Sequence, residues 1–233
     1  MKPAQAARAL AEATSSITTR QDVVDALVDL LDKCRVGLDV NAGGILVETS
    51  HGLDLLVSTS HAITELELHQ LHIDEGPCVD AHRTGERVQE HTRSALLERW
   101  PRFGQTMVTA GYESVHASPL GYDGLTFGAM GLFRRDAEPF TDDESVIAQA
   151  FADIGSMLII PVRDAPAEEV PTHLDEALSA RIMIEQAKGV LAEHHDLPMP
   201  DAYELLVRSA RDRRLPLTTW AATVLSSAEA PRG

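Results

Sequence analysis

Apolar positions switch between a helical and a strand period over the first 160 residues. Residues 23–34 carry apolar side chains at helical spacing, whereas 44–49 and 53–59 are short β-prone runs joined by Ser50-His51-Gly52, a plausible hairpin turn. We predict further strands at 87–91, 114–120 and 126–133, and further helices at 62–71, 100–110 and 141–160. Mixed periods of this kind predict an α+β fold with an antiparallel sheet.

The last of these helices has a recognisable start. Thr141 is followed three residues later by Glu144, the spacing of a capping box, in which each side chain accepts from the other residue's backbone N–H. The helix is therefore expected to begin after Thr141 and to end near Ile160.

Residues 161–173 predict a linker. They contain three prolines and four charged residues among thirteen, and proline both removes a backbone donor and disfavours helix in the residue before it. We expect a first domain over 1–160, this linker, and a second, all-helical domain over 174–230.

The charge of the chain is unevenly divided. A net charge of -16 argues against nucleic acid, because phosphate binding relies on cations and counterion release. From Thr172 onward, however, 7 Lys and Arg stand against 9 Asp and Glu, which leaves 13 against 27 for the rest. The second domain can tolerate RNA, whereas the first repels it.

Composition and motifs set limits on class and location. Two cysteines are too few for a disulfide framework, the N-terminus lacks the pattern of a signal peptide, and no apolar run reaches the roughly 20 residues of a membrane span. We expect a soluble cytoplasmic protein without membrane contact. The absence of a Walker loop, dinucleotide fingerprint, haem motif or nucleophile elbow predicts no cofactor and no catalytic residues. His69 and His72 are an incomplete metal site, so we predict no metal.

The C-terminal stretch resembles a known family. It carries Arg181-x-x-Ile184-x-x-Ala187-Lys188-Gly189-x-Leu191, then residues 201–206, then Arg208 to Leu217, then Trp220-Ala221. This order and spacing resemble ANTAR domains, and the resemblance implies a small three-helix fold that binds paired RNA hairpins and prevents transcription termination. The chain departs from the common pattern at Val207, Pro216 and Trp220.

The first domain also resembles a family. The residues that carry the likeness are 74–78, 84–86, 99–101, 111–112, 118–120, 128–132 and 140–141. They resemble the GAF domain, which implies a six-stranded antiparallel sheet with flanking helices, used to sense a small molecule or a redox signal.

One helical face of the second domain is apolar. Its positions are spaced 3, 4, 3 and 4 and comprise Ala177, Ala180, Ile184, Ala187 and Leu191. Such a seam is typical of core packing or of a dimer contact. Gly189 lies in the same helix, where glycine costs roughly 1 kcal/mol relative to alanine, so we expect another helix or an RNA backbone to approach it closely.

Two groups of cations are candidates for RNA contact. Arg181 and Lys188 lie on one flank of the seam, about 10 Å apart at 1.5 Å per residue, although Glu185 between them offers a purely structural pairing. The second group, near the end of the next helix, comprises Arg208, Arg211, Arg213 and Arg214. Cations are also favoured there by the helix dipole.

The sequence allows two interpretations for each of two further residues. Cys78 follows Gly76-Pro77 on a turn leading into a short helix, whose N-terminus lowers a thiol pKa, so a redox role is conceivable beside a buried structural one. Trp220 is expected in the core, with stacking on an RNA base as the alternative.

These features predict a signal-responsive, homodimeric, RNA-binding antitermination regulator whose first domain controls the second through the helix ending near Ile160, the linker and the seam. The alternatives are a protein-interaction regulator that does not bind RNA, and a thiol-dependent reductase using Cys78 with Cys34.

Overall fold

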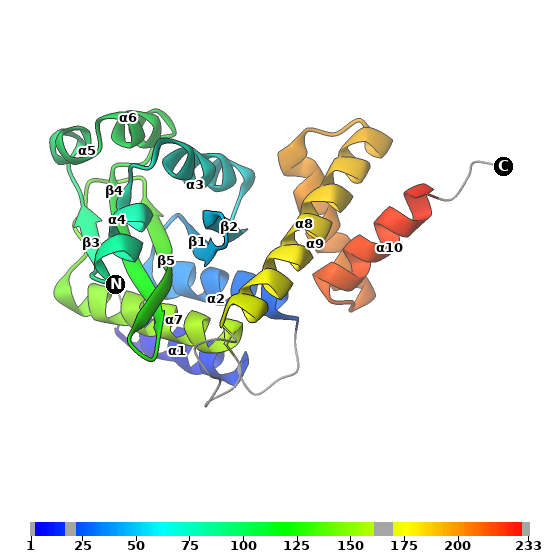
Figure 1. Cartoon of the computed structure of the whole chain (residues 1–233), viewed down its shortest axis with the longest axis horizontal. Helices are drawn as coiled ribbons and strands as arrows, with labels where there is room; N and C mark the ends of the chain where they lie inside the picture. The colour runs from blue at the N-terminus through cyan, green and yellow to red at the C-terminus, as the bar shows by residue number, and fades with distance from the viewer. Residues whose placement is uncertain (1–2, 17–21, 161–169, 230–233) are drawn as a thin grey trace.

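The part of the chain up to Ile160, which we call the sensor after its GAF resemblance, is built on one antiparallel sheet. The computed structural model describes residues 3–16, 22–160 and 170–229 (Figure 1). Its five strands lie in the order β2-β1-β5-β4-β3. They are β1 (Ala42–Thr49), β2 (Gly52–Ser58), β3 (Val88–Glu90), β4 (Ser114–Tyr122) and β5 (Leu125–Arg134). All five predicted strands are present, but the sixth strand implied by the GAF resemblance does not occur among the described residues.

Helices cover both faces of this sheet. On one face lie α1 (Pro3–Ser16), α2 (Val23–Leu38) and α7 (Asp142–Ile159); on the other lie α3 (His61–Ile73), α4 (Pro77–Thr84), α5 (Arg93–Arg99) and α6 (Pro101–Thr109). The strand period explains both contacts, because Ile45 and Val47 face the first helical layer and Leu46 faces the second. Helix α5 has only seven residues and was not predicted, since so short a segment carries little periodicity.

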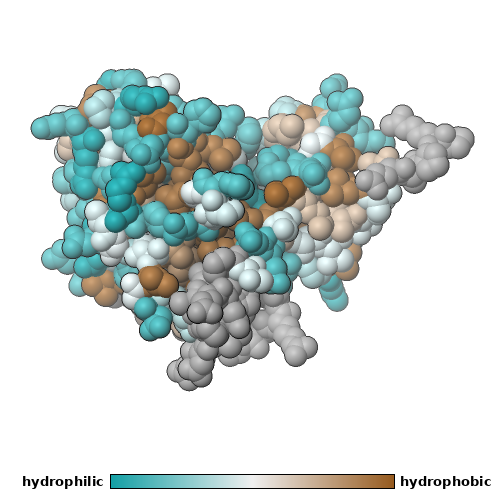
Figure 2. Space-filling view, viewed as in Figure 1, coloured by the Kyte–Doolittle hydropathy of each residue, from teal (hydrophilic) through white to brown (hydrophobic). Residues whose placement is uncertain are grey.

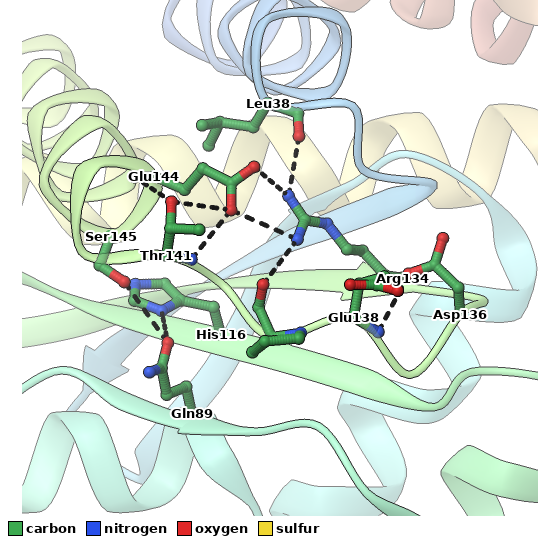
Figure 3. A network of polar contacts seen from close by, with 10 residues as sticks. Leu38, Gln89, His116, Arg134, Asp136, Glu138, Thr141, Glu144 and Ser145 are labelled. Atoms are coloured by element: carbon green, nitrogen blue, oxygen red, sulfur yellow. Dashed lines mark hydrogen bonds and ion pairs between the residues drawn. The ribbon is translucent and has the colours of Figure 1, made fainter. Parts of the chain in front are cut away.

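A buried ion pair holds the C-terminal end of α2 in place (Figure 3). Arg134, at the end of β5, donates to the carbonyl of Leu38 at 3.0 Å and pairs with Glu144 of α7 at 2.9 Å. Its guanidinium also stacks 4.0 Å above the ring of Phe140. The predicted capping box is confirmed, with Thr141 and Glu144 bonding reciprocally at the start of α7. One network therefore joins α2, β5 and α7.

The C-terminal part consists of three helices, α8 (Val170–His195), α9 (Met199–Arg213) and α10 (Leu217–Glu229). Helix α8 begins inside the range predicted as linker, and the rest of that range, 161–169, lies outside the described residues. Figure 1 shows α8 running beside the sensor with α10 on its outer side. Ile184 and Leu217 belong to the same buried apolar cluster as Val24 and Leu27 of α2, so the two halves share a core.

Candidate nucleic-acid interface

The two candidate cations of α8 face the sensor. Arg181 donates to Asp54 of β2 at 3.1 Å, and its side chain is only 15% exposed against 48% for Asp54. The pairing of Arg181 with Glu185 that the spacing allowed does not occur, because a sensor carboxylate takes that place. This cation is therefore half of a contact between the two parts of the chain.

Lys188 is buried at the same contact. It is 5% exposed and its ammonium group bonds the carboxylate of Glu185, three residues earlier on α8. The pocket around it is lined from the sensor by Val24, Val28, residues 55–58, Ser60, His61 and Thr64, and from the C-terminal part by Arg181, Ile184, Glu185, Tyr203 and Leu217. A phosphate cannot reach Lys188 while the sensor lies against α8.

The arginines near the end of α9 are more accessible than Arg181 and Lys188, and they form two pairs with different contacts. Arg208 and Arg211 line a cleft of about 460 Å³ between α9 and the turn that joins β2 to α3. Arg211 approaches Asp32 of α2 at 3.8 Å, with the two side chains 69% and 42% exposed. In Figure 2 the C-terminal helices form a lobe joined to the sensor along one side, with a notch between the two parts.

The other two arginines stabilise the end of α9. Arg213 donates to the carbonyl of Ser209 at 3.1 Å, and its guanidinium stacks 4.0 Å above the indole of Trp220. Arg214 has a left-handed backbone, with φ of 54°, and caps α9 through its own N–H. Trp220 packs against the shared core with half-buried side chain. All four arginines remain exposed residues.

Helix α10 receives its N-terminal cap from the sensor. Pro216 precedes its first residue and offers no side-chain acceptor. The N–H of Leu217 instead donates to Asp25 of α2 at 2.7 Å, and the hydroxyl of Thr218 donates to Asp22 at 2.8 Å. Asp22 also caps its own helix, accepting from the N–H groups of Val24 and Asp25 with its other oxygen. Burial raises the pKa of Asp25, and the Leu217 N–H opposes that shift.

The sensor residues that contact α9 and α10 were not predicted from the sequence, although their spacing along the chain could have indicated them. The acidic positions of α2 are spaced 3, 4 and 3 and comprise Asp22, Asp25, Asp29 and Asp32. That spacing places them on one helical face. We call these four residues the acidic stripe; three of them contact α9 or α10.

The apolar seam of α8 lies in the core of the chain itself. Ala177 and Ala187 are fully buried and Ile184 is 4% exposed, whereas Ala180 and Leu191 are half-buried beside them. The approach of another helix to Gly189 does not occur among the described residues, since a side chain there would meet no atom within 4 Å; the approach of an RNA backbone stays a prediction.

Cys78 is fully buried on the opposite face of the sheet from Cys34. Burial raises the pKa of its thiol well above the usual value and so opposes the lowering that the start of α4 would cause. Its sulfur lies 3.9 Å from the carboxyl of Glu67, which is itself fully buried and bonds Gln70. Gly131 leaves room for this pair, because a side chain there would lie 2.8 Å from both.

Two classes of site have no candidate among the described residues. No group of three or more His, Cys, Asp and Glu side chains is placed to hold a metal ion. Across the same segments, no helix combines the length and apolar character needed to cross a membrane.

Comparison with protein families finds one family match for each half of the chain. The GAF domain matches residues 17–159 and the ANTAR domain matches residues 172–225, in that order. The first match covers more than half of the chain, and the second covers α9 and most of α8 and α10.

A curated relative matches the C-terminal part. The transcriptional regulatory protein PdtaR of Mycobacterium tuberculosis, in strains CDC 1551 and H37Rv, is 39% identical over 64 residues. The match takes in 28% of this chain and 31% of PdtaR, so the chain spans less than a third of that relative.

Solved structures match the sensor half. The GAF domains of phosphoenolpyruvate-protein phosphotransferases from Acinetobacter and from Coxiella burnetii superpose with TM-scores of 0.54 and 0.55. Each is 15% identical, and the matches cover 69% and 70% of this chain and 96% and 97% of those domains. At that identity the likeness concerns the fold alone.

Proposed function

Because the chain belongs to the GAF family and carries an ANTAR domain at its C-terminal end, we propose that it is a signal-responsive regulator that binds paired RNA hairpins and promotes transcription antitermination. The observation that carries the proposal is the ANTAR match over residues 172–225, with 39% identity to PdtaR, a transcriptional regulatory protein. The GAF domain supplies the sensing part, and we propose a small molecule as its signal.

The arrangement of charge supports a role in RNA binding for the end of α9. Arg208, Arg211, Arg213 and Arg214 lie within seven residues of an otherwise strongly acidic chain and stay exposed. Arginine suits phosphate because its planar guanidinium donates two parallel hydrogen bonds. The stack of Arg213 on Trp220 also holds one guanidinium in place beside an aromatic ring. We assign these residues affinity for the RNA backbone and no base specificity.

Lys188 and Arg181 belong to the proposed RNA surface in a second conformation. Both lie on one flank of α8, and both are covered by the sensor in the present arrangement. Their use therefore requires α8 to move away from β2. We propose that homodimerisation accompanies this change, because two hairpins call for two copies of the ANTAR domain.

The test is to recover and titrate the RNA. Crosslinking the protein to cellular RNA should yield tandem hairpins upstream of genes, and one such RNA is then titrated by fluorescence anisotropy. Arg208→Gln with Arg211→Gln should weaken binding at least tenfold and reduce the slope of log K against log salt by about 1.5, since each phosphate contact contributes roughly 0.7–0.9.

The matched control is Arg93→Gln, an exposed arginine of α5 that lies outside the ANTAR domain. It should bind RNA as the wild type does. Equal affinity of the double variant and the wild type, or recovery of a stable protein complex without RNA, would overturn the proposal and favour a protein-interaction regulator.

A further inference from the structure

The contact between the two halves is rich in sensor carboxylates. Asp54 holds Arg181, Asp32 approaches Arg211, and Asp22 and Asp25 hold the first turn of α10. Arg181 and Arg211 are also candidates for RNA phosphates. A carboxylate of the sensor thus pairs with each of these two arginines, as a phosphate of RNA would.

Helix α10 depends on this contact for its start. The first N–H groups of a helix have no partner within it, and the residue that ordinarily supplies an acceptor here is Pro216. Asp25 fills that role from α2, with Asp22 beside it on the Thr218 hydroxyl. Two carboxylates at the positive end of a helix dipole add a favourable electrostatic contact.

Helix α2 is suited to transmit a change inside the sensor. Its C-terminal end is fixed by the Leu38 carbonyl to the buried Arg134–Glu144 pair, and its N-terminal end carries the cap of α10. Between these ends its apolar face packs in the core shared with α7 and the sheet. A shift of the sensor core that moves α2 therefore moves the acceptors of α10 with it.

We infer that the carboxylates Asp22, Asp25, Asp32 and Asp54 form an autoinhibitory latch, which holds the ANTAR domain against the sensor by capping α10 and by occupying its cations. Release of the latch exposes Lys188 and Arg181 together. The inference rests on the proposed function only for its consequence, tighter RNA binding; the latch itself is testable without RNA.

The ion pairs of the latch, which act beside the apolar core that the two halves share, fit a reversible switch. The Arg211–Asp32 pair is largely exposed and Asp54 is half-exposed, and such pairs contribute little individually and are screened by salt. A small differential affinity of a signal for two conformations can then shift their populations.

Lysine acylation reports directly on whether the latch is closed, because Lys188 is buried while the ANTAR domain lies against the sensor. The lysines of the chain are Lys2, Lys33 and Lys188, and Lys33 lies on α2 beside Asp29 and α1. We expect the variant Asp22→Asn, Asp25→Ala, Asp54→Asn to be acylated at Lys188 by an N-hydroxysuccinimide ester at least fivefold faster than the wild type, read by mass spectrometry. Lys33 should change less than twofold. Asp22→Asn keeps an oxygen for its own helix cap.

The matched control is Asp153→Asn on α7, whose side chain bonds Gln149 of the same helix. It should leave Lys188 protected. Folding of each variant is checked by Cys34 and Cys78, which are fully buried and should stay unreactive towards a thiol reagent.

Exchanging the charges of one pair tests the latch even if the triple variant does not fold. Asp54→Arg alone and Arg181→Asp alone should each raise the Lys188 acylation rate, and the two together should restore protection. A folded triple variant with unchanged Lys188 protection, or failure of the exchange to restore it, would overturn the latch, whereas an open but RNA-inert variant would leave the latch standing and contradict the proposed function.

Discussion

Two arginine–carboxylate pairs of this molecule have the same chemistry and opposite surroundings. Arg134 and Glu144 lie 2.9 Å apart with side chains 6% and 7% exposed, inside the sensor; Arg211 and Asp32 lie 3.8 Å apart with side chains 69% and 42% exposed, between the two halves. Breaking a buried pair leaves an uncompensated charge, whereas water replaces an exposed partner at little cost. The first pair thus holds α2, β5 and α7 together, whereas breaking the second costs little.

The largest effect is expected from Arg134→Met. It leaves the carboxylate of Glu144 buried without its main partner and frees the carbonyl of Leu38, so the free energy of unfolding should fall by about 3–5 kcal/mol. Urea denaturation measures this fall. Arg8→Met, which breaks an exposed pair with Glu12 on α1, should leave the free energy of unfolding nearly unchanged, because water replaces the lost partner. Equal effects of the two would contradict the comparison.

An intermediate effect is expected from Glu67→Gln. Burial raises the pKa of Glu67 from 4.5 to about 8 in the folded protein. The folded state therefore keeps a proton that the unfolded state loses, so the wild type should lose stability as pH rises from 4.5 to 8, on the order of 4 kcal/mol in total.

The Gln variant should lack this fall, because its side chain does not titrate. Urea midpoints at pH 5, 6.5 and 8 measure the difference. Glu65→Gln, an exposed position on the same helix, should keep the wild-type slope. The same slope in the Glu67→Gln protein would show that another group causes it.

The smallest effect on stability is expected from Asp54→Asn. Its pair with Arg181 is half-exposed on the acid side, so the free energy of unfolding should change by no more than about 1 kcal/mol. Even so, acylation of Lys188 should rise modestly, and added salt should reduce the difference from the wild type because the pair is screened. A large loss of stability would place Asp54 with the permanent contacts of the sensor.

The sequence predicted the elements well where periodicity and capping are local. The strand runs, the helix of α3 and the Thr141–Glu144 box depend on neighbouring residues, and each formed as expected. The short α5 was missed, because seven residues give little pattern. The sixth strand, which the family resemblance alone implied, does not occur among the described residues.

The candidate site was harder to predict, because its decisive partners are distant in the chain. Arg181 meets Asp54, 127 residues away, and Thr218 meets Asp22, 196 residues away. The flank of Lys188 was identified from helical register, but register cannot say which neighbour covers it. The acidic stripe of α2 had the right spacing to suggest a contact face, and only the fold shows what it faces.

The sensor covers Lys188 and Arg181, two cations that we propose bind RNA in the open protein. The most direct measurement is the dissociation constant of a tandem-hairpin RNA for the wild type and for the variant Asp22→Asn, Asp25→Ala, Asp54→Asn, by fluorescence anisotropy at fixed salt. We predict that the variant binds at least tenfold more tightly and that adding Lys188→Ala removes most of this gain. Equal dissociation constants for a folded variant and the wild type would show that the sensor does not restrict RNA binding.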